Sequence, residues 1–141
     1  MNRKIKFRGK RIDNGEWVYG YYVVDPVGEH RIYWKPPYEA TSNPYRFVFA
    51  ETVGQFTGLH DKNGKYIFEG DILTVSYPRI AIEEQLQSKI GVVEFLDTLP
   101  AFCVMRNKFP NCKTVSSFNN TGEQWEVIGN IHDNPELLKT E

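Results

Sequence analysis

The sequence has only two cysteines and no long apolar run, and both scarcities exclude classes of protein. Cys103 and Cys112 are too few for a disulfide-rich secreted scaffold and lack the close spacing of zinc ligands, so we expect free thiols and no metal. No apolar stretch reaches the roughly 18 residues that indicate a membrane-spanning helix. Met1 to Arg11 begins with charges and lacks the apolar core of a signal peptide, which predicts a cytoplasmic protein.

An excess of one charge sign is also missing, since 17 Lys and Arg residues face 18 Asp and Glu residues for a net charge of −1. This balance argues against nucleic acid or an anionic membrane as the main partner. The distribution is uneven, because residues 1–11 hold six basic side chains and no acid. This strip favours, as the alternative function, nucleic-acid binding by Arg3, Lys4, Lys6, Arg8 and Lys10. The competing interpretation is that these cations discourage edge-to-edge strand pairing.

Motifs that specify a reaction are absent from the sequence, which has no GxSxG elbow, no P-loop and no GxGxxG loop. His60-Asp61 and His132-Asp133 pair a histidine with an acid, but neighbours on an extended chain point to opposite faces, which favours polar turn chemistry. Asp61-x-Asn63-Gly64 resembles part of a calcium loop, yet that register puts Gly70 where a glutamate ligand is required. We therefore predict a non-enzymatic protein with no cofactor and no catalytic residue, and a small hydrolase is the least favoured function.

Aromatic and β-branched residues are abundant, with 9 Phe, 8 Tyr and 3 Trp, and hydrophobic residues make up 40% of the chain. Apolar positions follow a period of two, and the runs are short and closed by Gly, Asn, Asp or Pro. This pattern predicts a mainly β protein of antiparallel strands with at most one or two short helices. Asp61-Lys62-Asn63-Gly64 is a strong hairpin signal, and Gly20 within a strand suggests a bulge or a close backbone contact.

The chain length predicts one compact unit made of two closely joined parts. Residues 1–50 are expected to form an antiparallel meander with a Pro-rich loop. Residues 51–141 are expected to form an SH3-like small barrel with a short C-terminal helix, for which Asn134-Pro135 supplies a cap. Residues 79–89 fit either a helix or an extended hairpin arm, because their apolar residues match both periods.

Aromatic residues also flank or occupy the Pro-rich segment 35–45, at Trp34, Tyr38 and Tyr45. Loops carry binding functions disproportionately, and Tyr and Trp are good anchors, so these three residues are the predicted partner-binding site. The competing interpretation is that the loop folds its aromatics back onto the protein. Exposed edge strands also predict a homo-oligomer.

The block Thr52–Lys65, continued by Ile67–Leu73, resembles the YopX family of small phage and prophage proteins. Ile5–Arg8, Gly91–Phe95 and Val127–Leu138 resemble the same family, so the likeness spans nearly the whole chain. The resemblance implies a β-rich, phage-associated protein without an established biochemical activity. It adds no catalytic residues, and the expected function is that of a non-enzymatic accessory protein that binds a host or phage protein.

Overall fold

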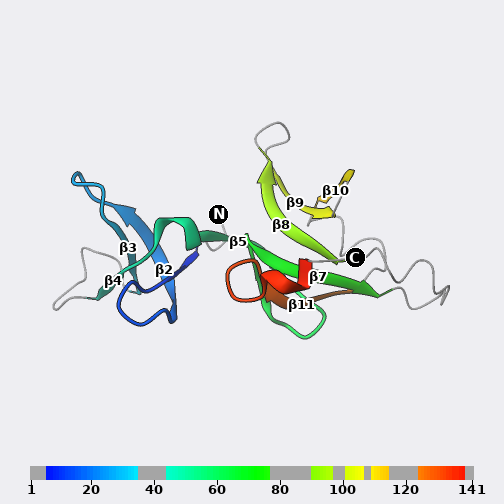
Figure 1. The fold of residues 1–141 in the computed structure, drawn as a ribbon, viewed down its shortest axis with the longest axis horizontal. Helices are drawn as coiled ribbons and strands as arrows, with labels where there is room; N and C mark the ends of the chain where they lie inside the picture. Colours follow the sequence, from blue (N-terminus) through cyan, green and yellow to red (C-terminus); the bar gives the residue numbers. More distant parts are fainter. Residues whose placement is uncertain are drawn as a thin grey trace. The chain divides into compact units, whose positions relative to one another are not determined.

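The computed structural model describes residues 6–34, 44–76, 90–96, 101–106, 109–114 and 124–138, and within them eleven strands and two short 3-10 helices (Figure 1). The strands are β1 (Phe7–Lys10), β2 (Trp17–Val24), β3 (His30–Tyr33), β4 (Tyr45–Phe47), β5 (Gly54–His60), β6 (Tyr66–Phe68), β7 (Asp71–Ser76), β8 (Ile90–Leu96), β9 (Ala101–Arg106), β10 (Phe109–Thr114) and β11 (Gln124–Asn130). The helices are η2 (Ala50–Thr52) and η4 (Pro135–Leu138). The prediction of a mainly β, antiparallel protein is confirmed, while the SH3-like character of its second part stays a prediction.

The chain divides into two compact units, residues 1–56 (unit 1) and residues 57–141 (unit 2). Strand β5 begins in unit 1 and ends in unit 2, so the division falls inside a strand, whereas the sequence predicts a boundary at residue 50. None of the described helices is long and apolar enough to cross a membrane.

Unit 1 contains the antiparallel strands β4-β3-β2-β1, in that order, with the first residues of β5 beside β1. The sheet curls, because Arg11 bridges Val48 beyond the ends of β1 and β4. Two backbone bonds flank this bridge, from the Ile12 N–H to the Phe47 carbonyl at 3.0 Å and from the Phe49 N–H to the Lys10 carbonyl at 2.9 Å. The curled sheet encloses Val48, which is 2% exposed.

Gly20 lies where β2 and β3 approach each other most closely. Its φ is +154°, and a Cβ atom there would lie 2.0 Å from the Tyr33 carbonyl oxygen. No side chain fits such a gap, so only glycine allows this pairing. The predicted close backbone contact at Gly20 is therefore confirmed.

Unit 2 contains a five-stranded antiparallel sheet in the order β10-β9-β8-β7-β11. A core of Ile67, Leu73, Val93 and Trp125 packs together, each at most 4% exposed. The predicted hairpin turn after β5 is confirmed, since the Gly64 N–H donates to the Asp61 carbonyl at 3.0 Å and Gly64 has a φ of +82°.

The Asp61 carboxylate joins that hairpin turn to β11. It accepts hydrogen bonds from the backbone N–H groups of Asn63 at 2.9 Å, Lys65 at 2.8 Å and Val127 at 2.9 Å. Burial acts to raise the pKa of Asp61, but the three backbone hydrogen bonds outweigh it and hold the pKa below its usual value. The carboxylate beside His60 therefore serves turn chemistry, as the sequence indicated.

The side-chain oxygen of Asn134, the predicted cap of the C-terminal helix, accepts from the Asn130 N–H at 3.3 Å, and its capping of the helix stays a prediction. Helix η4 is a single turn that starts at Pro135, and the Leu137 N–H donates to the Asn134 carbonyl at 3.1 Å. The predicted short helix is confirmed in this 3-10 form. Segment 79–89, the side chains of Cys103 and Cys112, and most of the Pro-rich loop lie outside the described residues.

Candidate protein-binding site

The β3–β4 hairpin carries two of the three aromatic residues predicted to bind a partner, and Tyr38 lies outside the described residues. Tyr33 pairs directly with Tyr45 across the two strands, and the Trp34 N–H donates to the Pro44 carbonyl at 3.1 Å. Because side chains alternate along a strand, Tyr45 and Trp34 lie on opposite faces of the hairpin. The structure thus brings them to one element but does not join them in one patch.

One face of the hairpin is an aromatic cluster around Arg31. The Arg31 guanidinium lies 4.8 Å from the ring centroid of Tyr45 and 5.0 Å from that of Phe47. The Tyr45 ring is 5.1 Å from the Tyr33 ring and 5.5 Å from the Phe47 ring. Cation–π contacts of this kind contribute about 0.5–1 kcal/mol each at exposed sites, so the cluster fixes the conformation of β4.

Arg31 is held in the cluster by two acids of the preceding turn. Its Nη2 atom lies 2.9 Å from Asp25 and 3.3 Å from Glu29. The backbone N–H of Glu29 donates to the Asp25 carboxylate at 2.8 Å, and this bond is the main cause that lowers the pKa of Asp25. The turn between β2 and β3 therefore supplies the two carboxylates that pair with the Arg31 guanidinium.

An open groove of about 600 Å³ lies beside β4. It is lined by residues of two turns and of the strand, namely Ile12, Asp13, Gly28, Glu29, His30, Tyr45, Arg46, Phe47 and Val48. All of these belong to unit 1. The buried Val48 and the 54% exposed Ile12 give the groove an apolar part, and the remaining side chains add both signs of charge.

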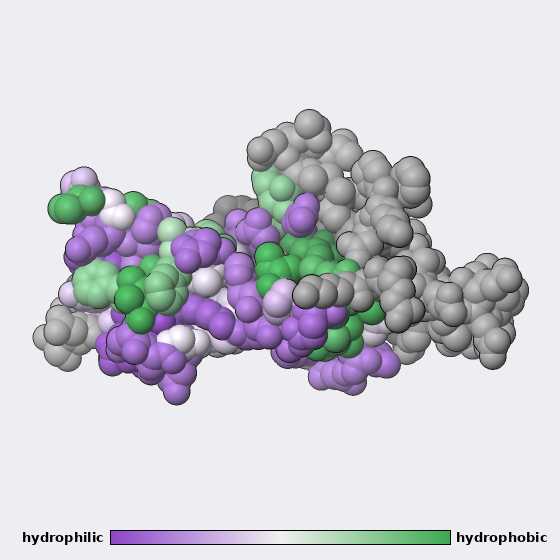
Figure 2. Space-filling model, in the orientation of Figure 1, coloured by the Kyte–Doolittle hydropathy of each residue, from purple (hydrophilic) through white to green (hydrophobic). Residues whose placement is uncertain are grey.

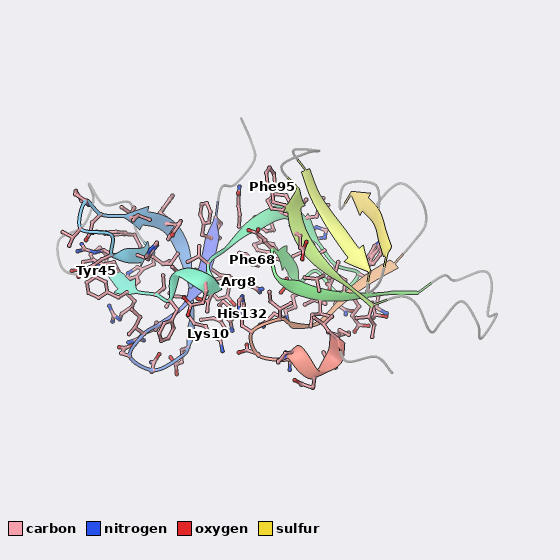
Figure 3. All side chains as sticks on the ribbon, turned by 45° about the horizontal axis from the view of Figure 1, so that its top comes forward. Arg8, Lys10, Tyr45, Phe68, Phe95 and His132 are labelled. Atoms are coloured by element: carbon pink, nitrogen blue, oxygen red, sulfur yellow. The ribbon has the colours of Figure 1, made fainter. Side chains whose placement is uncertain are left out.

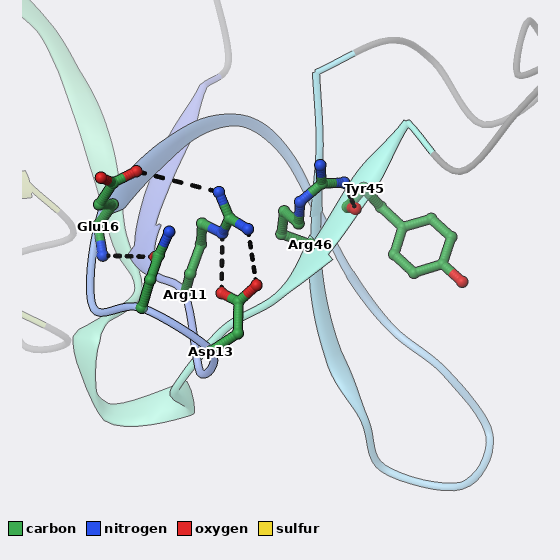
Figure 4. Close-up of polar contacts among 6 residues, drawn as sticks. Arg11, Asp13, Glu16, Tyr45 and Arg46 are labelled. Carbon is green, nitrogen blue, oxygen red and sulfur yellow. Dashed lines mark hydrogen bonds and ion pairs between the residues drawn. The ribbon is translucent and has the colours of Figure 1, made fainter.

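Both acids of the groove are engaged by arginines. Asp13 makes two hydrogen bonds with Arg11, at 2.9 and 2.6 Å (Figure 4). The side-chain hydrogen bond from Arg11 holds the pKa of Asp13 below its usual value. Glu29 pairs with Arg31. Both carboxylates of the groove are therefore already matched by an arginine.

Arg46 differs from these arginines because none of the described acids pairs with it. Its Nη1 atom donates to the Tyr45 carbonyl at 2.8 Å, and its guanidinium lies 4.9 Å from the Trp34 ring centroid. Figure 4 shows the Arg46 and Tyr45 side chains leaving β4 in different directions. Arg46 thus brings to the groove a positive charge that no acid of the described residues compensates.

His30 is the second nitrogen-bearing side chain that lines the groove, and its ring is hydrogen-bonded to the half-buried Tyr22. The Tyr22 hydroxyl and the His30 Nδ1 atom are 2.5 Å apart, and the two rings are stacked with centroids 5.8 Å apart. Burial raises the pKa of Tyr22, so its hydroxyl keeps its proton at neutral pH. The hydrogen bond occupies Nδ1, which makes Nε2 the ring nitrogen of His30 that is available to a ligand.

The sequence-based prediction missed both His30 and Arg46. Neither belongs to a motif, and they come together through the antiparallel registers of β2, β3 and β4. An arginine between two aromatics, as in Tyr45-Arg46-Phe47, was the only local signal of a strand that carries charge on one face and rings on the other.

The described part of unit 1 is rich in exposed apolar side chains, two of which, Ile12 and Phe47, line the groove. Within unit 1, large hydrophobic residues at least 39% exposed are Ile12, Tyr19, Tyr21, Val24, Val27, Trp34, Phe47 and Phe49. Figure 2 shows such apolar atoms interspersed with hydrophilic ones on this part of the surface. Exposed aromatics beside a groove are typical of a binding surface.

The family model for YopX protein matches residues 6–139, which is nearly the whole chain. This chain belongs to the YopX family. Its fold is also similar to the crystal structure of protein EF1440 from Enterococcus faecalis, with a TM-score of 0.57 and 24% sequence identity. That likeness covers 98% of this YopX chain and 100% of the other. No curated protein matches the chain.

The basic strand of this YopX-family chain is arranged differently from an open cationic strip. Arg8 is only 6% exposed, and its guanidinium lies 4.7 Å from the Trp17 ring centroid, where the Lys10 ammonium group also lies at 5.5 Å. Lys6 is half-buried, whereas Arg3 and Lys4 lie outside the described residues. Figure 3 shows Arg8 and Lys10 well away from Tyr45, so the two predicted sites are separate.

Proposed function

We propose that this YopX-family chain is a non-enzymatic phage or prophage accessory protein that binds a host or phage protein in the bacterial cytoplasm. The observation that carries the proposal is the open groove beside β4, bordered by exposed aromatic side chains. Family membership supports the accessory setting.

Two exposed aromatic residues are the proposed anchors. Trp34 is 46% exposed and Phe47 is 39% exposed, and both lie on the β3–β4 hairpin or at its end. Burial of large aromatic side chains dominates the energetics of many protein interfaces, at about 2 kcal/mol or more for a hot-spot residue. A hairpin held in place by its own cation–π contacts presents such anchors with little loss of conformational entropy on binding.

The test is affinity capture of the tagged chain from bacterial host lysate, with and without nuclease, followed by mass spectrometry. We expect a stoichiometric protein partner that survives nuclease treatment. The variants Trp34→Ala and Phe47→Ala should each reduce capture by at least about tenfold while the fold persists. Tyr66→Ala is the matched control, because Tyr66 is an equally exposed aromatic, at 40%, on a strand of unit 2.

Each alternative gives a different outcome. Loss of all recovered material on nuclease treatment would favour nucleic-acid binding by Lys6, Arg8 and Lys10, with affinity that falls steeply as salt rises. Recovery of the chain alone, at a mass above that of a monomer in light scattering, would favour self-association through edge strands. Capture that is unchanged in both hairpin variants would refute the assignment to the β3–β4 hairpin.

A further inference from the structure

We propose that the groove beside β4 binds an extended acidic segment of the partner protein, in which a carboxylate next to an apolar side chain pairs with Arg46. This inference rests on the proposed function and names the chemistry of the partner. It is carried by the distribution of charge in the groove and by the Tyr45 N–H at the edge of β4.

Charge complementarity selects an anion. The groove contains two acids and two basic or nitrogen-donor side chains, but only the acids have partners of opposite charge among the described residues. Asp13 is bound by Arg11 through both carboxylate oxygens, and Glu29 is bound by Arg31. A cationic ligand would have to compete with these arginines, whereas an anionic ligand meets an arginine that no described acid neutralises.

Arg46 is oriented for such a ligand. One of its N–H groups is fixed on the Tyr45 carbonyl, and the Trp34 ring supports the flat guanidinium. The remaining N–H groups can bind a carboxylate, the geometry for which a guanidinium is best suited. His30 lines the same groove, and because the Tyr22 hydroxyl occupies Nδ1, its Nε2 atom is the ring nitrogen that a ligand can reach.

The backbone of β4 favours an extended ligand. The Trp34 N–H donates to the Pro44 carbonyl, and the Val48 N–H donates to the His30 carbonyl. The backbone groups of Pro44 and Val48, which flank β4, therefore point toward β3, as do those of every second residue between them. The backbone groups of Tyr45 and Phe47 point the other way. Ile12 already donates to the Phe47 carbonyl and the Arg46 side chain donates to the Tyr45 carbonyl, so the Tyr45 N–H is the edge donor that remains for a carbonyl of an extended ligand. Extended peptides pair with such sheet edges in other proteins.

The apolar part of the groove determines which kind of side chain accompanies the carboxylate in the bound segment. Ile12 is 54% exposed, and Val48 forms part of the lining. An aliphatic or aromatic side chain of the bound segment would cover Ile12. Because side chains on a strand alternate, a carboxylate and an apolar residue two positions apart would face the groove together.

The experiment uses the full chain, immobilised, and a phage-displayed library of random linear peptides. Selection on the wild-type chain should enrich sequences with Asp or Glu two positions from an apolar residue. Selection on Arg46→Gln should lose the acidic preference, and Lys62→Gln, which removes one positive charge from unit 2, should retain it. Peptides without an acidic preference, or no enrichment at all, would overturn the proposal.

A double-mutant cycle then measures the pair directly. The best peptide and its Glu→Gln or Asp→Asn analogue are titrated by fluorescence anisotropy into wild-type chain and Arg46→Gln. We expect the peptide change to weaken binding to wild type on the order of tenfold to a hundredfold, and to have almost no effect on the variant. Arg46→Lys, which keeps the charge but not the planar group, should lose part of the affinity. Equal losses in both backgrounds would refute the pairing with Arg46.

The two proposals fail in different ways. A lysate partner that is captured equally well by wild type and Arg46→Gln, while Trp34→Ala loses it, would leave the proposed function intact and refute the acidic ligand. An unchanged amide NMR spectrum outside β3, β4 and the flanking turns verifies that Arg46→Gln is folded.

Discussion

Replacing Asp61 should destabilise unit 2 by an amount that depends on how many of its three hydrogen bonds survive. Asp61→Ala removes both acceptor oxygens and with them all three hydrogen bonds. The turn residues Asn63 and Lys65 are exposed, so their N–H groups can bond water, which leaves a loss of about 1 kcal/mol each. The N–H of Val127 on β11 has no such replacement and costs about 1–3 kcal/mol. We expect a total loss of about 3–5 kcal/mol in the free energy of unfolding.

Asp61→Asn separates these contributions. One carboxylate oxygen accepts both turn bonds and the other accepts the bond from Val127. An asparagine whose carbonyl keeps the turn bonds must point its NH₂ group at the Val127 N–H, so two donors face each other. The expected loss is about 1–3 kcal/mol, confined to the connection with β11.

The assay is urea unfolding followed by the indole NMR resonance of Trp125, which is 4% exposed in the core of unit 2. Amide hydrogen exchange at Val127 reports the lost bond itself. Glu126→Gln is the control, because its ion pair with Lys62 is largely exposed and should contribute less than about 1 kcal/mol. A stability of Asp61→Asn equal to that of wild type at neutral pH would refute the reasoning.

The pH dependence gives a second check on Asp61. Its pKa is lower in the folded chain than in the unfolded chain, where a value of about 3.9 is usual. The carboxylate therefore contributes stability that is fully present above the unfolded pKa and is lost as pH falls through the folded pKa. The difference in stability between wild type and Asp61→Asn should be constant from about pH 5 to about pH 8 and should shrink in stronger acid.

Three further substitutions test other contacts. Gly20→Ala should cost about 3–5 kcal/mol in urea unfolding of unit 1, since its new Cβ collides with a β3 carbonyl. Tyr22→Phe removes the hydroxyl bonded to His30 and should change the tautomer balance of that ring, as read from its ¹⁵N chemical shifts. Gly129→Ala places a Cβ 2.6 Å from the Asn134 side-chain oxygen and should cost about 1 kcal/mol, with faster amide exchange at the start of η4.

Local turn chemistry explains what the sequence predicts well. The Asp61–Gly64 hairpin and the short helix that starts at Pro135 follow from residue types whose preferences act over a few positions. Most strands likewise follow from short apolar runs with a period of two. Strand β10 does not, because Pro110 interrupts the pattern and the pairing with β9 shifts register between Phe109 and Lys113. Proline is tolerated there because β10 is an edge strand.

The candidate site depends on pairing that no single segment encodes. Trp34 and Tyr45 are noticeable in the sequence as aromatics beside prolines, but their placement on opposite faces follows from the register of β3 against β4. Arg46 and His30 become neighbours of one groove through the register of β3 against β4, in which Ile32 lies opposite Arg46. The burial of Arg8 was also beyond prediction, because alternation with Phe7 indicated an exposed cationic face.

Because β7 pairs with β11, unit 2 can complete its sheet only later in protein synthesis than unit 1. All strand partners within unit 1 are available once residue 56 has emerged from the ribosome. Most pairings in unit 1 join strands that follow each other in the sequence. Strand β7 must wait for β11, since Asp71 pairs with Asn130 near the end of the chain. The groove can therefore form while unit 2 still exposes an open strand edge. A truncation before residue 124 would leave that edge permanently uncovered.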